Sequence, residues 1–171
     1  MASTAARIGY NARAALERLS CCFARIMRNA DHQHDEQEVL AANEAFYRAV
    51  EALDLKQMGA AWWHDDWVLC LHPGWPLVRG WEGVLQSWTD ILRAASQLKV
   101  SISRPLVCVL GDAAWVSCVE QITTALNGDF VAARVETTNI FARRQGRWKM
   151  VHHHTTPLPG SGLTETSQSV Q

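Results

Sequence analysis

The sequence predicts a single α+β domain, and three observations support this prediction. Amphipathic helical patterns fill most of the first half, long strand-like runs fill the second half, and turn signals separate those runs at Gly111-Asp112, Asn127-Gly128 and Gln145-Gly146. A chain of 171 residues with 48% hydrophobic residues can build one core. The net charge of −1 gives no electrostatic reason to expect nucleic acid or an anionic membrane as a partner. No apolar run approaches the roughly 20 residues that cross a bilayer.

Helical periodicity predicts three helices, beginning at Asp35, at about Leu55 and at Trp81. The first presents one apolar face, and acidic residues lie near its positive N-terminal end. A short strand over residues 67–71 precedes the third helix, and His72-Pro73-Gly74 ends it because proline cannot extend a ladder. Four long strands then form a meander over about residues 98–110, 113–126, 130–143 and 147–155.

The two ends of the chain differ from this central region, 35–157. Residues 1–34 hold five arginines against one glutamate before Asp31, a pattern typical of an organellar transit peptide or of a helical or disordered extension. The tail 158–171 is rich in Ser, Thr and Gly and is expected to be disordered. Five cysteines without a Cys-x-x-Cys pair favour reduced, buried thiols. We therefore expect a cytoplasmic protein, or an organellar one if residues 1–34 are a transit peptide.

Two tight turns predict how the last three strands pair, since two-residue hairpin loops set register. A turn centred on Asn127-Gly128 places Glu120 opposite Val135, Cys118 opposite Thr137, and Val116 opposite Asn139. A turn centred on Gln145-Gly146 places Phe141 opposite Met150, Asn139 opposite His152, and Thr137 opposite His154. Both turns therefore put the same residues on one face of the sheet: Val116, Cys118, Glu120, Val135, Thr137, Asn139, Phe141, Met150, His152 and His154.

This face is apolar near the turns and polar at its far end, as expected where helices cover a sheet and leave a pocket at one end. The opposite face holds Trp115, Arg134, Ile140, Lys149, Val151 and His153, among others, and suits solvent or a subunit interface. A slip of one residue in either turn would exchange the two faces.

The polar end of the predicted inner face carries a candidate acid–base site. His154 would be the acid/base, assisted by His152, because burial or a nearby carboxylate can hold an imidazole near neutrality. We expect the ligand to be bound by His72, Asn139, Thr137, Glu120, Trp88 and Cys118. Catalysis, binding without catalysis, and purely structural histidines all remain open at this point.

A metal site is a separate alternative, with His72 approaching His152 or His154 and Glu120 as a further ligand. The sequence has no compact His-x-x-x-His pair, so we predict neither a metal nor a cofactor. No Gly-x-Ser-x-Gly elbow or glycine-rich phosphate loop is present.

Several short segments together resemble the SnoaL-like members of the nuclear-transport-factor-2-like superfamily, over about residues 36–157. They are Ala41-Ala42-Asn43-Glu44-Ala45-Phe46-Tyr47, Asp54 with Met58 and Trp62, Cys70-Leu71-His72-Pro73-Gly74, Gly80-Trp81, Ser87-Trp88, Gly111-Asp112-Ala113-Ala114-Trp115-Val116, Thr138-Asn139-Ile140-Phe141, and Gly146-Arg147-Trp148-Lys149-Met150-Val151-His152-His153-His154.

The resemblance implies a cone-shaped α+β fold, in which a curved mixed or antiparallel sheet wraps around about three helices and leaves an open-ended pocket. It also implies a homodimer formed through the outer sheet face. Relatives include ketosteroid isomerases, polyketide cyclases and dehydratases, alongside association modules without catalysis. The expected partner is a small hydrophobic or aromatic molecule. The alternative is a non-catalytic dimerisation module that uses Trp115, Arg134 and Ile140. Fold alone is weak support for either function.

Overall fold

The computed structural model describes residues 31–126, 129–159 and 164–165. The chain divides into two compact units, Met1–Asp35 and Glu36–Gln171, and the fold below is that of the second unit. Most of the predicted N-terminal extension and the turn residues Asn127 and Gly128 lie outside the described residues.

Three helices are described. The first runs through residues 31–51. Helix α2, Leu55–Ala61, begins where the Asp54 carboxylate accepts hydrogen bonds from two backbone amides at its N-terminus. Helix α3, Trp81–Ala94, follows Gly80, whose φ of 75° is readily adopted only by glycine. The apolar faces of these helices lie against the sheet, with Phe46, Trp62 and Trp88 in the core.

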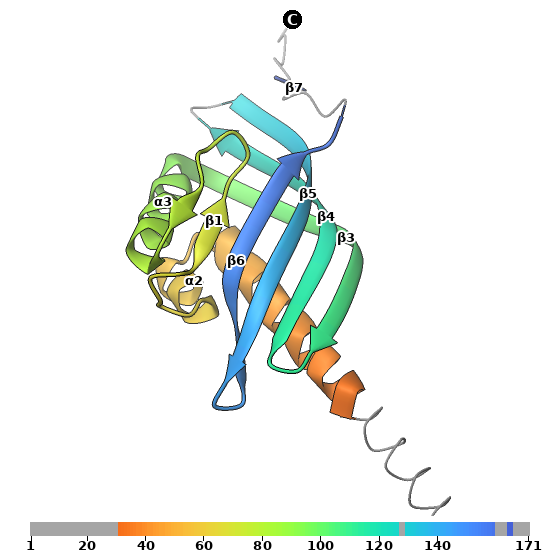
Figure 1. Ribbon diagram of the computed structural model, residues 1–171. Coiled ribbons are helices and arrows are strands. Elements are labelled where there is room, and N and C mark those ends of the chain that lie inside the picture. Colours follow the sequence, from red (N-terminus) through yellow and green to blue (C-terminus); the bar gives the residue numbers. More distant parts are fainter. Residues whose placement is uncertain (1–30, 127–128, 160–163, 166–171) are drawn as a thin grey trace, which may run out of the picture. The chain divides into compact units, whose positions relative to one another are not determined.

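The strands form one curved, unclosed sheet (Figure 1). They are β1 (Leu69–Leu71), β2 (Val78–Arg79), β3 (Ala95–Leu110), β4 (Ala113–Leu126), β5 (Asp129–Arg144), β6 (Arg147–Pro157) and β7 (Thr164–Glu165). The order is β2-β1-β6-β5-β4-β3, with β7 on β5. Strand β1 runs parallel to β6, and the other pairs are antiparallel. The predicted α+β class with a curved mixed sheet is confirmed.

The predicted pairing of β4 with β5 is also confirmed. Glu120 lies opposite Val135, Cys118 opposite Thr137, and Val116 opposite Asn139. The face on which these residues lie is buried along both strands. The next turn is as predicted too: Gln145 and Gly146 both have positive φ, 51° and 70°, as a two-residue type I′ hairpin requires.

The predicted pairing of β5 with β6 is wrong beyond Met150. Phe141 faces Met150 as expected, but Ile140 faces His152, and Val151 is the extra residue of a β-bulge. The bulge therefore places Asn139 opposite His153 and Thr138 opposite His154. Met150 and Val151 are both buried in succession, and the inside–outside alternation resumes one residue late. His153 faces the core, whereas His152 and His154 belong to the outer face.

The bulge coincides with the point where the end of α2 meets the sheet. Trp62 forms a parallel bridge with Met150, and the Trp63 amide donates to the Met150 carbonyl at 3.0 Å. A bulge is favoured here because a strand that bends can meet the helix end without losing its partners farther along. Among the described residues, none of the helices combines the length and apolarity that crossing a bilayer requires.

Candidate functional site

A cavity of about 270 Å³ lies between the helices and the inner face of the sheet, within the second unit. Its walls are mainly apolar and aromatic, with Phe46, Trp75 and Trp88 among them. Its polar lining comes chiefly from His72, Tyr47, Glu120, His153 and Thr155. Of the described residues that line the cavity, none is lysine or arginine. An apolar pocket with a few convergent polar groups is typical of a small-molecule site.

His153 is held by a buried hydrogen-bond network from β5 and the first helix. Its Nδ1 lies 2.7 Å from Asn139 Oδ1. The Asn139 amide nitrogen donates in turn to Asn43 Oδ1 at 2.8 Å and to Tyr47 Oη at 3.2 Å. With its amide so engaged, Asn139 presents only its carbonyl to His153, so Nδ1 carries the proton. The basic lone pair of His153 is therefore on Nε2.

Tyr47 connects this network to a buried carboxyl group. Its hydroxyl donates to Glu120 Oε1 at 2.5 Å and lies 3.5 Å from Cys118 Sγ. Burial raises the pKa of Glu120, against the lowering effect of the Tyr47 hydrogen bond. Burial and the neighbouring Glu120 also raise the pKa of Tyr47, so the phenol stays protonated. The cavity thus contains a carboxyl group that is biased toward its neutral form.

His72 is fixed in a similar way by α3. The Ser87 hydroxyl donates to the Val84 carbonyl at 2.8 Å, so it can only accept from His72 Nε2, 3.0 Å away. The proton is therefore on Nε2 and the lone pair on Nδ1. The ring lies edge-on to Trp88, with 4.7 Å between centroids, and 6.1 Å from the ring of His153.

Both cavity histidines are neutral near pH 7. Burial lowers the pKa of His72 to about 4. Burial also lowers the pKa of His153 well below 6.5, and the neighbouring His72 adds to the effect. The two rings thus act as neutral hydrogen-bonding groups that can accept a proton only when something stabilises the resulting charge.

The structure separates the predicted site residues into three groups. His72, Glu120 and Trp88 line the cavity. Asn139, Thr137 and Cys118 are buried but do not line it; Asn139 orients His153 from behind. His152 and His154, expected to provide the acid/base, lie on the outer face, where His154 is exposed beside Glu136, Thr138 and Thr156. Their predicted position at the pocket is wrong because Val151 shifts the register.

Among the cavity residues that were not identified from the sequence as site residues, His153 and Tyr47 belong to the hydrogen-bond network. The signal for Tyr47 was available, because Asn43 and Tyr47 are polar residues four apart on the face of a helix that packs on a sheet. The signal for His153 was the consecutive pair Met150-Val151, which breaks strict alternation. The predicted metal alternative also depended on His152 or His154 reaching His72. Within the described ranges, no three potential ligands of the His, Cys, Asp or Glu type are grouped as a metal would require.

Comparison with known proteins gives a consistent family. The family model described as SnoaL-like domain matches residues 39–159. A solved structure from Streptomyces avermitilis, provisionally named a dehydratase of the NTF2-like family, is 31% identical; the match covers 75% of this chain and 99% of that one, with a TM-score of 0.70.

Two other similar proteins bear different names. A protein from Thiobacillus denitrificans, provisionally named a calcium/calmodulin-dependent protein kinase type II association domain, is 32% identical over 69% of this chain and 93% of that one, with a TM-score of 0.56. F-box protein SKIP8 from Arabidopsis thaliana is 28% identical over 120 residues, which are 70% of this chain and 49% of SKIP8. The chain thus spans about half the length of that curated relative.

Proposed function

This chain belongs to the SnoaL-like domain family, and on that premise we propose that it binds a small, neutral, largely aromatic molecule in the cavity and acts on it as an acid–base enzyme of the dehydratase type. The observation that supports this most directly is the pair of neutral imidazoles, His72 and His153. In each ring one nitrogen is hydrogen-bonded to the protein. The other nitrogen, which carries the lone pair, is Nε2 in His153 and Nδ1 in His72, and the latter lies 4.0 Å from Cys70 Sγ.

The lining favours a ligand that donates hydrogen bonds. The lone pairs of His72 Nδ1 and His153 Nε2 are acceptors, and the aromatic walls suit a flat ring. A carboxylate ligand would lose its hydration without gaining a cationic partner, because no lysine or arginine lines the cavity. A neutral hydroxylated ring fits these constraints best.

The proposed reaction is elimination of water from a β-hydroxy carbonyl compound. His153 Nε2 accepts the proton from the carbon next to the carbonyl, and the electrons of that C–H bond form the carbon–carbon double bond. The C–O bond to the hydroxyl breaks as protonated Glu120 donates its proton, and water leaves. The imidazolium then returns its proton to the Glu120 carboxylate, which restores both groups. Burial opposes charge on both residues, so the neutral pair is the resting state.

Matched ligands and matched variants test this proposal. At neutral pH, 2-naphthol should raise the unfolding temperature and 2-naphthoate should not. The chain should also convert 4-hydroxy-4-phenylbutan-2-one to benzylideneacetone, followed by ultraviolet absorbance. His153→Gln should slow that conversion by about 100-fold or more, whereas His154→Gln on the outer face should leave it unchanged. Equal stabilisation by the two naphthyl compounds, or equal rates for the two variants, would refute the proposed site.

A non-catalytic dimerisation module is the second candidate function. Three large apolar side chains are exposed on β3 and β4: Leu106 at 66%, Leu110 at 72% and Trp115 at 36%. Exposed apolar side chains of this size favour a protein interface. The relative named as a kinase association domain agrees with this candidate. If it is correct, Trp115→Ala dissociates an assembly in sedimentation velocity, and His153→Gln has no effect on any ligand-induced stabilisation.

A further inference from the structure

A second hollow, separate from the cavity, lies where the first helix, α2 and the β5–β6 hairpin meet. It is an open groove of about 470 Å³ and shares no lining residue with the cavity. Its helical walls are built largely of alanine, with the polar residues Glu38 and Gln57 among them; the alanines are Ala41, Ala42, Ala45, Ala60 and Ala61. From Glu38 to Ala45 the first helix rises about 10 Å, so the groove extends for about two helical turns. Small side chains over that length let another backbone approach closely.

The hairpin side of the groove carries Arg147, Trp148 and Lys149. The guanidinium of Arg147 and the ammonium of Lys149 both lie over the ring of Trp63, at 5.9 and 5.1 Å from its centroid. Arg144 also lies over that ring, at 5.1 Å, but it pairs with Asp65 at 2.8 Å. In the part of the chain that the structure describes, neither Arg147 nor Lys149 has a carboxylate partner.

Crowding two cations without a counter-ion is unfavourable. The charge of Arg147 and partial burial lower the pKa of Lys149, with burial the larger cause. The buried indole N–H of Trp148 also has no hydrogen-bond acceptor among the described residues. An incoming carboxylate would relieve the crowding of the two cations, whereas the Trp148 N–H is buried and lies out of its reach.

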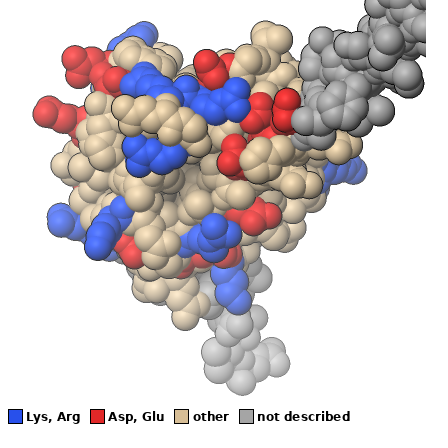
Figure 2. All heavy atoms as spheres, turned by 90° about the horizontal axis from the view of Figure 1, so that it is seen from below, with Lys and Arg blue, Asp and Glu red and all other residues tan. Residues whose placement is uncertain are grey.

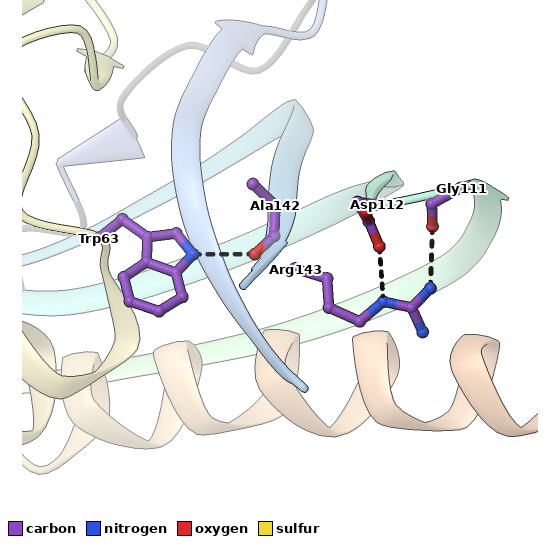
Figure 3. Close-up of polar contacts among 5 residues, drawn as sticks. All are labelled: Trp63, Gly111, Asp112, Ala142 and Arg143. Carbon is purple, nitrogen blue, oxygen red and sulfur yellow. Dashed lines mark hydrogen bonds and ion pairs between the residues drawn. The ribbon is translucent and has the colours of Figure 1, made fainter. Parts of the chain in front are cut away.

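The Trp63 ring beneath these cations, and the hairpin that carries them, are held in place by hydrogen bonds. The Trp63 indole N–H donates to the Ala142 carbonyl at 2.8 Å, and Arg143 ties β5 to the β3–β4 turn through Asp112 and Gly111, at 2.9 and 3.4 Å (Figure 3). The view from the hairpin end shows lysine and arginine side chains, with several aspartate and glutamate side chains among them, around a mostly uncharged centre (Figure 2). The arrangement is thus preformed, which lowers the entropy cost of docking.

We propose that this groove docks an acidic amphipathic helix of a partner protein. Small or aliphatic side chains of the helix lie on the alanine walls, and its aspartate or glutamate side chains pair with Arg147 and Lys149. The helix-in-groove mode needs both an apolar floor and a matching charged rim; the alanines supply the floor, and Arg147 and Lys149 supply the cations on the hairpin side. The docking surface is independent of the cavity chemistry, so either proposal can fail alone.

Charge also argues against two other occupants, a segment of this chain and a second copy. Residues 1–34 of this chain carry Arg7, Arg13, Arg18, Arg25 and Arg28, so that segment would bring cations to a cationic rim. A second copy of the groove face meets the same objection, because a two-fold axis through the groove would place the two rims near each other.

The test uses the full chain and two labelled helical peptides of about 16 residues, roughly 24 Å of helix. One has leucine and alanine on one face and glutamate on the other, and its match has lysine at every glutamate position. Fluorescence anisotropy measures binding at low ionic strength. The acidic peptide should bind at least about tenfold more tightly than the basic one.

Two variants and one control locate the binding. Arg147→Glu combined with Lys149→Glu should weaken binding of the acidic peptide at least about tenfold. Ala41→Glu, at an exposed position on the groove wall, should also weaken binding of the acidic peptide, and it tests the helical wall separately from the hairpin. Arg93→Glu combined with Lys99→Glu makes the same charge change at exposed sites outside the groove and should leave binding within about twofold.

Four results would overturn the proposal: equal binding of both peptides, binding that survives the double reversal, displacement by millimolar phosphate at constant ionic strength, or loss of self-association in the double reversal. The third indicates a small-anion site, and the fourth indicates a second copy.

Discussion

Three consecutive histidines on β6 occupy two different environments. His153 is 3% exposed, bonded to Asn139, and part of the cavity wall. His152 and His154 lie on the other side of the same strand, with 5.9 Å between their ring centroids, and His154 is open to solvent. The residue type is the same at all three positions, yet the inner ring is held by Asn139 in one tautomer, and burial lowers its pKa well below the usual value. The difference comes from one extra residue in the strand.

That contrast shows where acid–base chemistry can arise in this fold. Burial and a partner that fixes one ring nitrogen act together at His153, which lines the same cavity as Glu120; the exposed His154 on the outer face lacks that burial. The cavity side is therefore sensitive to small substitutions, whereas the outer side is tolerant. Substitutions and pH changes on each side test whether the two environments differ in this way.

The largest effect is expected for His153→Ala. Removing the ring leaves a void beside Phe46 and Trp88 and deprives buried Asn139 Oδ1 of its donor. The free energy of unfolding should fall by about 4 kcal/mol, since a cavity and an unpaired buried acceptor are created together. Urea denaturation followed by circular dichroism measures the loss. A loss below about 1 kcal/mol would mean that His153 is not packed as described.

The next largest effect is the dependence of stability on pH. The unfolded chain protonates His72 near 6.5, whereas the folded chain keeps it neutral down to about 4. The unfolded state therefore binds more protons in that window, so stability is complete above pH 6.5 and falls as the pH drops toward 4. For His72 alone the loss approaches about 3 kcal/mol.

Two other cavity groups modify this slope. His153, whose pKa is also lowered, adds a loss of the same sign. Glu120 acts in the opposite direction, because its raised pKa makes the folded state bind a proton first as the pH falls toward 4.5. Denaturation across this range should show a shallower slope for His72→Gln than for the parent chain. Identical slopes would show that His72 is not titrating as a buried neutral ring.

A smaller effect is expected for Ser87→Ala. The substitution removes the acceptor of His72 Nε2–H and should cost about 1–2 kcal/mol. Cys70 Sγ, 3.4 Å from the same nitrogen, is a weaker replacement acceptor and keeps the cost low. Ser103→Ala, at an exposed position on β3, is the matched control and should be neutral. Nitrogen-15 shifts of His72 check the tautomer directly.

Much of this fold could be predicted from local signals in the sequence. Gly146 favours a turn through its own backbone preference, and the two-residue turn then sets the pairing of Arg144 with Arg147 and of Phe141 with Met150. The β4–β5 register followed in the same way. These features depend on residues that are near one another in sequence.

The site could not be predicted to the same extent because the bulge depends on distant residues. Val151 is accommodated where Trp62 and Trp63, almost ninety positions earlier, meet β6. Period-two alternation cannot show that tertiary contact, so it assigned His152 and His154 to the wrong face. The neighbours of Glu120 and Asn139 along β4 and β5 were nevertheless identified, because no irregularity lies between those strands there.

The smallest effect is expected for His154→Ala, which should change the free energy of unfolding by less than about 0.5 kcal/mol. The side chain is exposed beside Glu136, Thr138 and Thr156, and its removal creates no buried void. Denaturation at several protein concentrations makes the measurement informative. A cost above about 1 kcal/mol that grows with concentration would mean that the outer face is buried in an assembly. Helices would then cover the inner side of β6, and another subunit would cover the outer side. The outer histidines would therefore no longer tolerate substitution.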